Sequence, residues 1–208
     1  MQFIPLIERV LPDGSLAPPP GDIAVDAVAR PAPWSVPPLG FGTFLNAVFD
    51  EWHAHDVGHR FVQQFEVHAA QFMGLPASLC VFAETCGKGL AVERNGDVFA
   101  CDHYVYPEYR VGNLVESPLG ELLSLERQDR FGRYKRNTLT AQCRACHFLF
   151  LCHGGCPKHR SARSQTGEPG HNILCSGYHK FFRHTVERLK AIAATLAERP
   201  WAIVSPGR

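Results

Sequence analysis

Four cysteines lie close together between residues 143 and 156, and each can bind a metal as a thiolate. Two residues separate the first pair, five the next and three the last; they are Cys143, Cys146, Cys152 and Cys156. Thiolates are grouped in this way when one short loop holds a soft metal centre. We therefore predict that this segment is the centre around which the chain is organised.

Pro157 follows directly after the last of these cysteines. A Cys-x3-Cys-Pro ending also occurs in bacterial two-cluster ferredoxins, where the cysteine before the proline binds the other cluster. Gly154 and Gly155 separate the two cysteines, and glycine tolerates positive φ and adds no side chain. The backbone is therefore predicted to fold tightly between Cys152 and Cys156.

The chain has eight cysteines, enough for two sites with four ligands each. The remaining four are Cys80, Cys86, Cys101 and Cys175. Spacing alone does not separate two [4Fe–4S] clusters from two zinc ions. The apolar segment 148–151 favours iron, because apolar walls keep water away from a cluster. Disulfides are disfavoured, because a chain of this length does not need them and no secretory signal is recognised.

Composition indicates an ordinary soluble globular protein that does not bind nucleic acid. The 208 residues are 45% hydrophobic and 20% charged, and the formal net charge is +1. The sequence contains no run of about 18 apolar residues, so no transmembrane helix is predicted. We therefore expect a cytoplasmic protein with neither a membrane nor a nucleic acid as its partner.

The first third of the chain is predicted to alternate strands and helices. Strands are expected at 2–7 and 60–67, and helices at 41–55 and 68–73. Residues 11–40 are rich in proline and are expected to form a long irregular connection. This alternation is typical of a layer of parallel strands with helices.

A β-hairpin is predicted around Asn95 and Gly96, which lie between two apolar runs. Asn-Gly favours a type I′ turn, in which both residues have positive φ. A turn centred there places Cys101 opposite Leu90, so a loop at the hairpin base could bring Cys80 and Cys86 to the same centre as Cys101.

Helices are also predicted at 118–132 and 178–198. In the first, Leu119, Leu122, Leu123 and Leu125 are expected to face inward. The second carries an apolar stripe at 182, 186, 189, 193 and 196, and Pro200 is expected to end it. The basic segment 131–136 is interpreted as a solvated helix end, and a turn is expected at 167–170.

Several motifs resemble the SPASM domain, the cluster-carrying C-terminal extension of certain radical S-adenosylmethionine enzymes, and more narrowly the anaerobic sulfatase-maturating enzymes. The resemblance covers most of the chain except the proline-rich segment. The matching segments are 86–105, 109–113, 131–135, 143–158, 167–170 and 175–178, and the segment 2–5 resembles a late strand of that family's partial barrel.

The resemblance implies how the cysteines are divided. One auxiliary [4Fe–4S] cluster would be bound by Cys80, Cys86, Cys101 and Cys156. The other would be bound by Cys143, Cys146, Cys152 and Cys175. Asp102 matches the aspartate thought to take a proton from the substrate, although a structural cap at the hairpin end is the alternative. His103 also matches the family and is more often a structural residue than a ligand.

The resemblance also implies a fold and an activity. The expected fold is a remnant of a partial (β/α) barrel at 1–76, followed at 77–208 by a small, loop-rich α+β SPASM domain with a β-hairpin and a C-terminal helix. The family oxidises a Cys or Ser of a sulfatase to formylglycine. A deoxyadenosyl radical removes a hydrogen atom, and a base and an electron acceptor complete the oxidation.

The sequence departs from the family in one respect: it contains no Cys-x3-Cys-x2-Cys motif. We therefore expect S-adenosylmethionine and a third [4Fe–4S] cluster only in a full-length enzyme, and we interpret the chain as its truncated C-terminal part, inactive alone. The implied partners are a sulfatase polypeptide, the N-terminal radical half and an electron donor such as a flavodoxin or ferredoxin. The alternatives are a zinc module with two four-cysteine sites and a two-cluster electron-transfer module.

Overall fold

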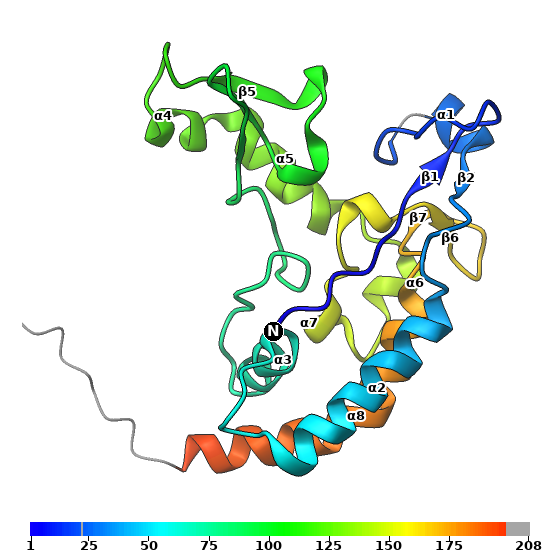
Figure 1. The fold of residues 1–208 in the computed structure, drawn as a ribbon, viewed down its shortest axis with the longest axis vertical. Coiled ribbons are helices and arrows are strands. Elements are labelled where there is room, and N and C mark those ends of the chain that lie inside the picture. Colours follow the sequence, from blue (N-terminus) through cyan, green and yellow to red (C-terminus); the bar gives the residue numbers. More distant parts are fainter. Residues whose placement is uncertain (22, 199–208) are drawn as a thin grey trace, which may run out of the picture.

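Two long helices lie side by side along one edge of the molecule (Figure 1). They belong to a computed structural model that describes residues 1–21 and 23–198. Helix α2 spans Pro38–His55 and helix α8 spans Cys175–Ala197. The helices predicted at 41–55 and 178–198 are therefore confirmed, with earlier starts, while Pro200 lies outside the described residues. Pro38 suits the first turn of α2, because its fixed φ matches the helix and its missing amide hydrogen needs no partner there.

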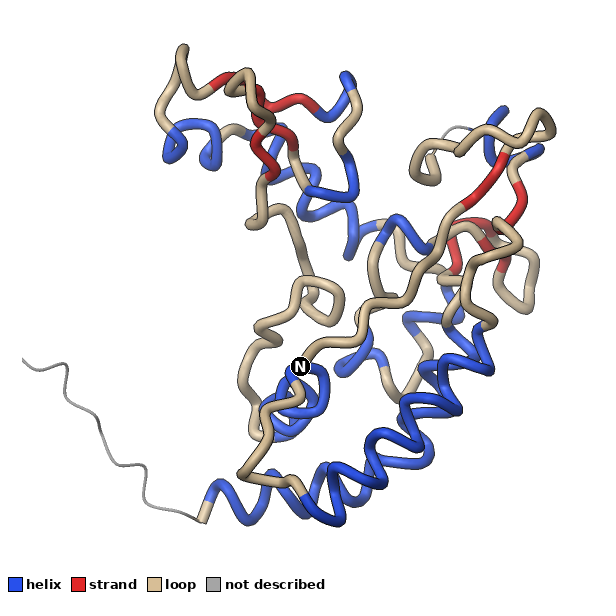
Figure 2. Tube along the Cα trace, in the orientation of Figure 1, coloured by secondary structure: helices blue, strands red, loops and turns tan. Residues whose placement is uncertain are grey.

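The other elements are short, as the tube in Figure 2 shows. The remaining helices are α1 (Ile23–Val28), α3 (Gln63–Phe72), α4 (Leu119–Ser124), α5 (Glu126–Asn137), α6 (Ala141–Arg144) and α7 (Leu149–Cys152). The strands are β1 (Arg9–Val10), β2 (Arg30–Pro31), β3 (Ala91–Val92), β4 (Asp97–Phe99), β5 (Arg110–Asn113), β6 (Ala162–Arg163) and β7 (Pro169–His171).

The strands form three small antiparallel sheets: β1-β2, β3-β4-β5 and β6-β7. The fold is mixed α/β, and the described residues contain no closed barrel. Among them, no helix has both the length and the apolar character needed to cross a bilayer.

Two predicted strands are wrong. Residues 2–7 run as an extended segment without a strand partner among the described residues, and isolated hydrogen bonds such as Val36 N–H to the Leu6 carbonyl tie them down. Residues 63–72 are helix α3, so the strand predicted at 60–67 is wrong and the helix predicted at 68–73 begins earlier. In α3, Phe65, His68 and Ala69 are buried. They repeat with the helical spacing i, i+3, i+4, so tertiary burial decides the conformation of this segment.

The main core joins α2, α3 and α8. Phe49, Phe65 and Phe181 are fully buried, and the Phe49 and Phe65 rings meet edge-to-face with centroids 5.1 Å apart. Each such ring stabilises the fold by roughly 2 kcal/mol. Phe82, between Cys80 and Cys86, and Leu151, beside Cys152, belong to the same core. The cysteine loops are thus attached directly to the most tightly packed part of the molecule.

The predicted hairpin is confirmed, but the predicted turn type and register are wrong. Strands β3 and β4 pair Ala91 with Phe99, one residue away from the predicted alignment. Glu93 N–H donates to the Asp97 carbonyl, and of the turn residues only Gly96 has positive φ, at 85°. The loop is therefore a three-residue turn with glycine in the left-handed position.

The helix predicted at 118–132 is two helices, because Leu125 takes an extended conformation between α4 and α5. Leu122 alone of the four predicted leucines is buried; Leu119 and Leu123 are exposed. The prediction of a solvated basic end is wrong for Lys135, whose side chain is completely buried.

Candidate metal centre

Four thiols from three separate segments line one cavity of about 170 Å³; they belong to Cys80, Cys86, Cys101 and Cys156. All eight cysteines of the chain are free thiols. A single water needs only about 10–15 Å³, so the cavity has room for a larger group. Soft thiolate donors around one space suit zinc or an iron–sulfur cluster.

Cys86 and Cys101 are held in place by helix α5. The Cys86 N–H donates to the Gly132 carbonyl at 3.2 Å. A side chain at Gly132 would collide with the Cys86 carbonyl, so only glycine permits this approach. The buried Gln128 amide donates to the Gly87 carbonyl at 2.6 Å and to the Ala100 carbonyl at 3.0 Å. One helix therefore fixes the residues next to both cysteines.

Cys156 follows the tight turn that the two glycines were predicted to allow. Gly154 and Gly155 have φ values of 71° and 64°, which confirms that prediction. His103 Nδ1 lies 3.4 Å from Cys156 Sγ. Cys156 is close in sequence to Cys143, Cys146 and Cys152, but it faces the cavity that the other three thiols of the first group line.

The second group consists of Cys143, Cys146, Cys152 and Cys175, which lie on or beside the short helices α6 and α7 and at the start of α8. Cys143 is in α6, and its N–H donates to the Thr140 hydroxyl that caps this helix. His171 Nδ1 lies 3.6 Å from Cys143 Sγ. Cys175 is the first residue of α8, where the helix dipole favours a negative thiolate.

Burial and neighbouring thiols raise the pKa values of Cys156 and Cys101 in the first group. Burial raises the pKa of Cys156 to about 11, and the charges of Cys80 and Cys86 add to this. Burial also raises the pKa of Cys101, helped by its hydrogen bond to Asp102 and by the charge of Cys156.

In the second group, burial likewise raises the pKa values of Cys152 and Cys175. Burial raises the pKa of Cys152 to about 12, reinforced by the charges of Cys175 and Cys143. Burial raises the pKa of Cys175 to about 11, and Cys143 and Cys146 contribute. Such thiols keep their protons until a metal ion replaces them, because only a bound cation offsets the charge of several thiolates.

Asp102 lies at the edge of the first cavity and opens the short 3-10 helix Asp102–Tyr104. Its Oδ1 accepts a hydrogen bond of 3.0 Å from Cys101 Sγ, and its side chain is exposed. That hydrogen bond lowers the pKa of Asp102, so the group is a carboxylate at neutral pH. An ionised carboxylate at the mouth of a cavity can accept a proton from a bound molecule.

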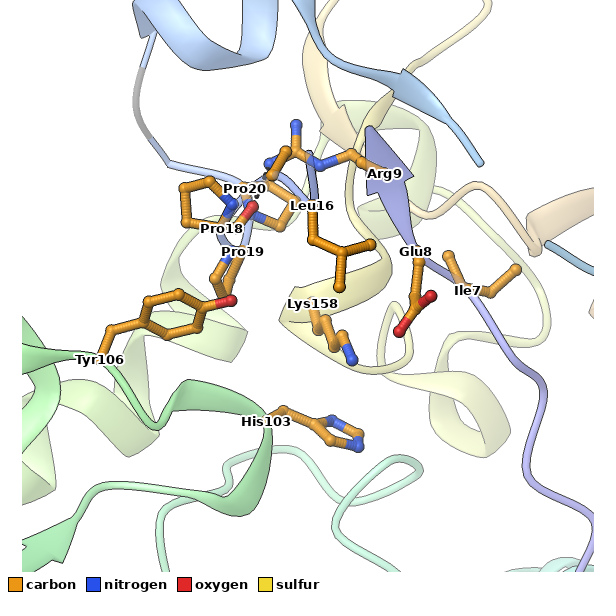
Figure 3. A pocket seen from close by; sticks show the side chains of 11 residues that line it. Ile7, Glu8, Arg9, Leu16, Pro18, Pro19, Pro20, His103, Tyr106 and Lys158 are labelled. Atoms are coloured by element: carbon orange, nitrogen blue, oxygen red, sulfur yellow. Dashed lines mark hydrogen bonds between the residues drawn. The ribbon is translucent and has the colours of Figure 1, made fainter. Parts of the chain in front are cut away.

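A smaller pocket of about 70 Å³ adjoins the thiol cavity, and His103 lines both. Figure 3 shows Glu8, Lys158 and His103 projecting toward its middle, with the proline-rich segment 17–20 along one side. The Glu8 carboxylate accepts a hydrogen bond of 2.6 Å from Trp34 Nε1. The pocket therefore places opposite charges next to the thiol cavity.

Several residues that hold the site were not recognised in the sequence. Gln71 of α3 is buried, and its amide donates to the carbonyls of Phe82 and Phe150, one in each cysteine-bearing region. Lys135 and Arg160 are buried cations beside the thiols. No sequence signal distinguishes such polar side chains from solvated ones, because their burial depends on contacts distant in the chain.

Comparison with known proteins gives consistent relatives. Residues 80–147 match the family model described as SPASM, an iron–sulfur cluster-binding domain. A serine-type anaerobic sulfatase-maturating enzyme of Bacteroides thetaiotaomicron is 42% identical over 186 residues, which are 88% of this chain and 44% of that protein. A cysteine-type enzyme of Clostridium novyi is 30% identical over 169 residues, which are 80% of this chain and 45% of that protein. The chain thus spans less than half the length of these relatives.

The same family is found among solved structures. Native anSMEcpe with bound AdoMet and Kp18Cys peptide superimposes with a TM-score of 0.69 and 26% identity, over 79% of this chain and 45% of that chain. The structure of native anSMEcpe with bound AdoMet gives a TM-score of 0.68 at 27% identity, over 78% of this chain and 44% of that chain.

Proposed function

We propose that this chain, a homologue of the anaerobic sulfatase-maturating enzymes with their SPASM segment, is the auxiliary-cluster part of an enzyme that oxidises a sulfatase Cys or Ser to formylglycine. The observation that carries the proposal is the first cavity, where four thiols and the Asp102 carboxylate converge. Thiol ligands and a base side by side are what a metal-assisted oxidation of a peptide side chain requires.

The donor set fits two iron–sulfur clusters. Eight free thiols fall into two groups of four: one lines the first cavity, and the other lies at α6, α7 and the start of α8. We assign Cys80, Cys86, Cys101 and Cys156 to one [4Fe–4S] cluster, and Cys143, Cys146, Cys152 and Cys175 to the other. When bound, such clusters carry single electrons.

Asp102 is assigned the role of the base. In the proposed oxidation, the substrate β-carbon loses a hydrogen atom to a radical made elsewhere in the enzyme. Its hydroxyl or thiol then gives a proton to Asp102, one electron leaves to an acceptor, and a C=O or C=S bond forms. Water hydrolyses a C=S product to the aldehyde and hydrogen sulfide. Asp102 is suited to this role because it is ionised and accessible from the cavity.

The remaining components belong to the same proposal. Residues 1–76 are assigned to a remnant of a partial (β/α) barrel, and the extended segment 2–7 would find strand partners only in the radical-generating part. S-adenosylmethionine and a third cluster would be bound by a radical-generating part, since these 208 residues contain no Cys-x3-Cys-x2-Cys motif. A sulfatase polypeptide is the proposed substrate, and a flavodoxin or ferredoxin the proposed electron donor.

Oxidation of a sulfatase-derived peptide tests this function. The chain is joined to the radical-generating part of the Bacteroides thetaiotaomicron relative, and formylglycine is measured by mass spectrometry. Asp102→Asn should reduce the rate roughly hundredfold or more, the usual contribution of a general base, while iron content stays unchanged. Asp129→Asn, at an exposed carboxylate on α5, is the matched control. Equal rates for Asp102→Asn and the unaltered chain would remove the base assignment.

A further inference from the structure

Two buried cations contact the backbone of the cysteine-bearing segments and have no carboxylate partner among the described residues. Lys135 of α5 is completely buried and Arg160 is 5% exposed. Within residues 1–21 and 23–198, neither forms an ion pair with an aspartate or glutamate. An isolated buried charge is strongly destabilising, so these two require a negative counterpart.

The surroundings of Lys135 match a protonated ammonium. Its Nζ donates to the Cys80 carbonyl at 2.6 Å, to the Val81 carbonyl at 3.0 Å and to the Ala83 carbonyl. An ammonium has three donors and no acceptor, so three carbonyls satisfy it completely. The positive charge is thereby fixed against the loop that carries Cys80.

Arg160 connects the backbone at Lys135 to the segment between Cys152 and Cys156. Its guanidinium donates to the Lys135 carbonyl at 2.7 Å and to the His153 carbonyl at 3.1 Å, and Nε donates to the Gly154 carbonyl at 3.2 Å. His153 and Gly154 lie between Cys152 and Cys156. Lys135 and Arg160 are therefore one unit that contacts the backbone of both regions.

The thiols become the negative counterparts of both cations once a bound metal has replaced their protons. Lys135 interacts electrostatically with Cys86, Cys152 and Cys156, which include members of both groups. Arg160 does so with Cys143, Cys152 and Cys156. A fixed positive charge near a redox centre favours the state that carries one more electron.

We infer that Lys135 and Arg160 are positioning residues that balance the negative charge of both thiolate groups and thereby raise the reduction potentials of the centres bound there. This inference rests on the proposed function, because it requires redox-active centres. Each cation acts on both centres, so removing either one should lower both potentials.

Reduction potentials of the iron-loaded chain test the inference. The chain is reconstituted anaerobically and titrated with dithionite, and the paramagnetic signal of each reduced centre is followed. Lys135→Met and Arg160→Gln should each lower the one-electron equilibrium constant for reduction of both centres by roughly tenfold or more. A tenfold change corresponds to a midpoint potential that is lower by about 59 mV. Arg136→Met, which removes a half-exposed charge from the next position of α5, should leave both within about threefold of the unaltered chain.

Incomplete loading does not obscure the result, because a midpoint potential is independent of the fraction of sites occupied. If neither neutral variant binds iron, Arg160→Lys decides. If Arg160→Lys binds iron and keeps the potentials of the unaltered chain, the result supports the role of the charge. If Arg160→Lys binds no iron, Arg160 has a purely structural role and the inference is overturned. Iron-loaded neutral variants with unchanged potentials also overturn it. An unaltered chain that binds no iron contradicts the proposed function itself.

Discussion

The two thiol groups are built differently. The first collects Cys80, Cys86, Cys101 and Cys156 from three segments distant in sequence, around a cavity that Asp102 borders. Side chains and backbone of α5 hold the loop of Cys80 and Cys86 next to the segment of Cys101. The second takes three of its thiols from the short segment 143–152 and the fourth from the start of α8. The first group thus depends on contacts between segments distant in sequence, whereas most of the second group comes from one short segment.

The largest expected effect comes from adding a side chain to Gly132, where α5 packs directly against the backbone of Cys86. Gly132→Val places a side chain on the Cys86 carbonyl. It should destabilise the fold by about 3 kcal/mol, the upper end for overpacking, and lose about half of the bound iron. Gly120→Val, at a helical position with open space around it, is the control. Loss of all the iron, measured per chain, would show that the two groups do not form independently.

Gln128→Ala should affect only the first thiol group, and it should destabilise the fold less than Gly132→Val does. It leaves the carbonyls of Gly87 and Ala100 without their donor, which should lower the free energy of unfolding by roughly 2 kcal/mol. Arg130→Ala, at an exposed position on the same helix, should change it by less than about 0.5 kcal/mol. Denaturant unfolding measures both, and equal effects would contradict the importance of α5.

Acid should weaken the contacts of Gln71, whose amide donates to the carbonyls of Phe82 and Phe150 and so joins the two cysteine-bearing regions. Burial lowers the pKa of His68 to about 4, and its Nδ1 lies 2.9 Å from the Oε1 of Gln71. The unfolded chain takes up the proton below its ordinary pKa near 6.5, and the folded chain does so only near 4. The contribution of His68 to stability is therefore full above about pH 6.5 and falls by roughly 1.4 kcal/mol per pH unit below it.

The control for this acid effect is His68→Gln, which has no proton to bind in this range. Its unfolding free energy should change less between pH 6.5 and 5.5 than that of the unaltered chain. Parallel pH profiles would show that His68 is not the group responsible.

Thr140→Ala should be the mildest change and should affect the second group alone. It removes the hydroxyl that accepts the Cys143 N–H and caps α6. Loss of such a cap costs about 1 kcal/mol, and iron should leave the second centre faster when a chelator is added. Thr195→Ala, on the exposed face of α8, is the control. Faster loss from the first centre would contradict the independence of the two groups.

Features set by local sequence were predictable and features set by distant contacts were not. The long helices and the hairpin follow from apolar periodicity and from Asn95-Gly96, and the tight turn at 154–155 follows from its glycines. The strand predicted at 60–67 fails because α2 and α8 select the helical face of Phe65 and His68. The site ligands remain predictions based on spacing and resemblance. Lys135 was misplaced at the surface, since nothing nearby in sequence reveals the carbonyls that surround it.

The metal content of the chain purified without oxygen tests the central claim most directly. Iron, acid-labile sulfide and zinc are measured on the same sample. Two cysteine-bound [4Fe–4S] clusters predict about eight irons and about eight sulfides per chain, with little zinc. About two zinc ions per chain without iron would contradict the account and identify the zinc module instead.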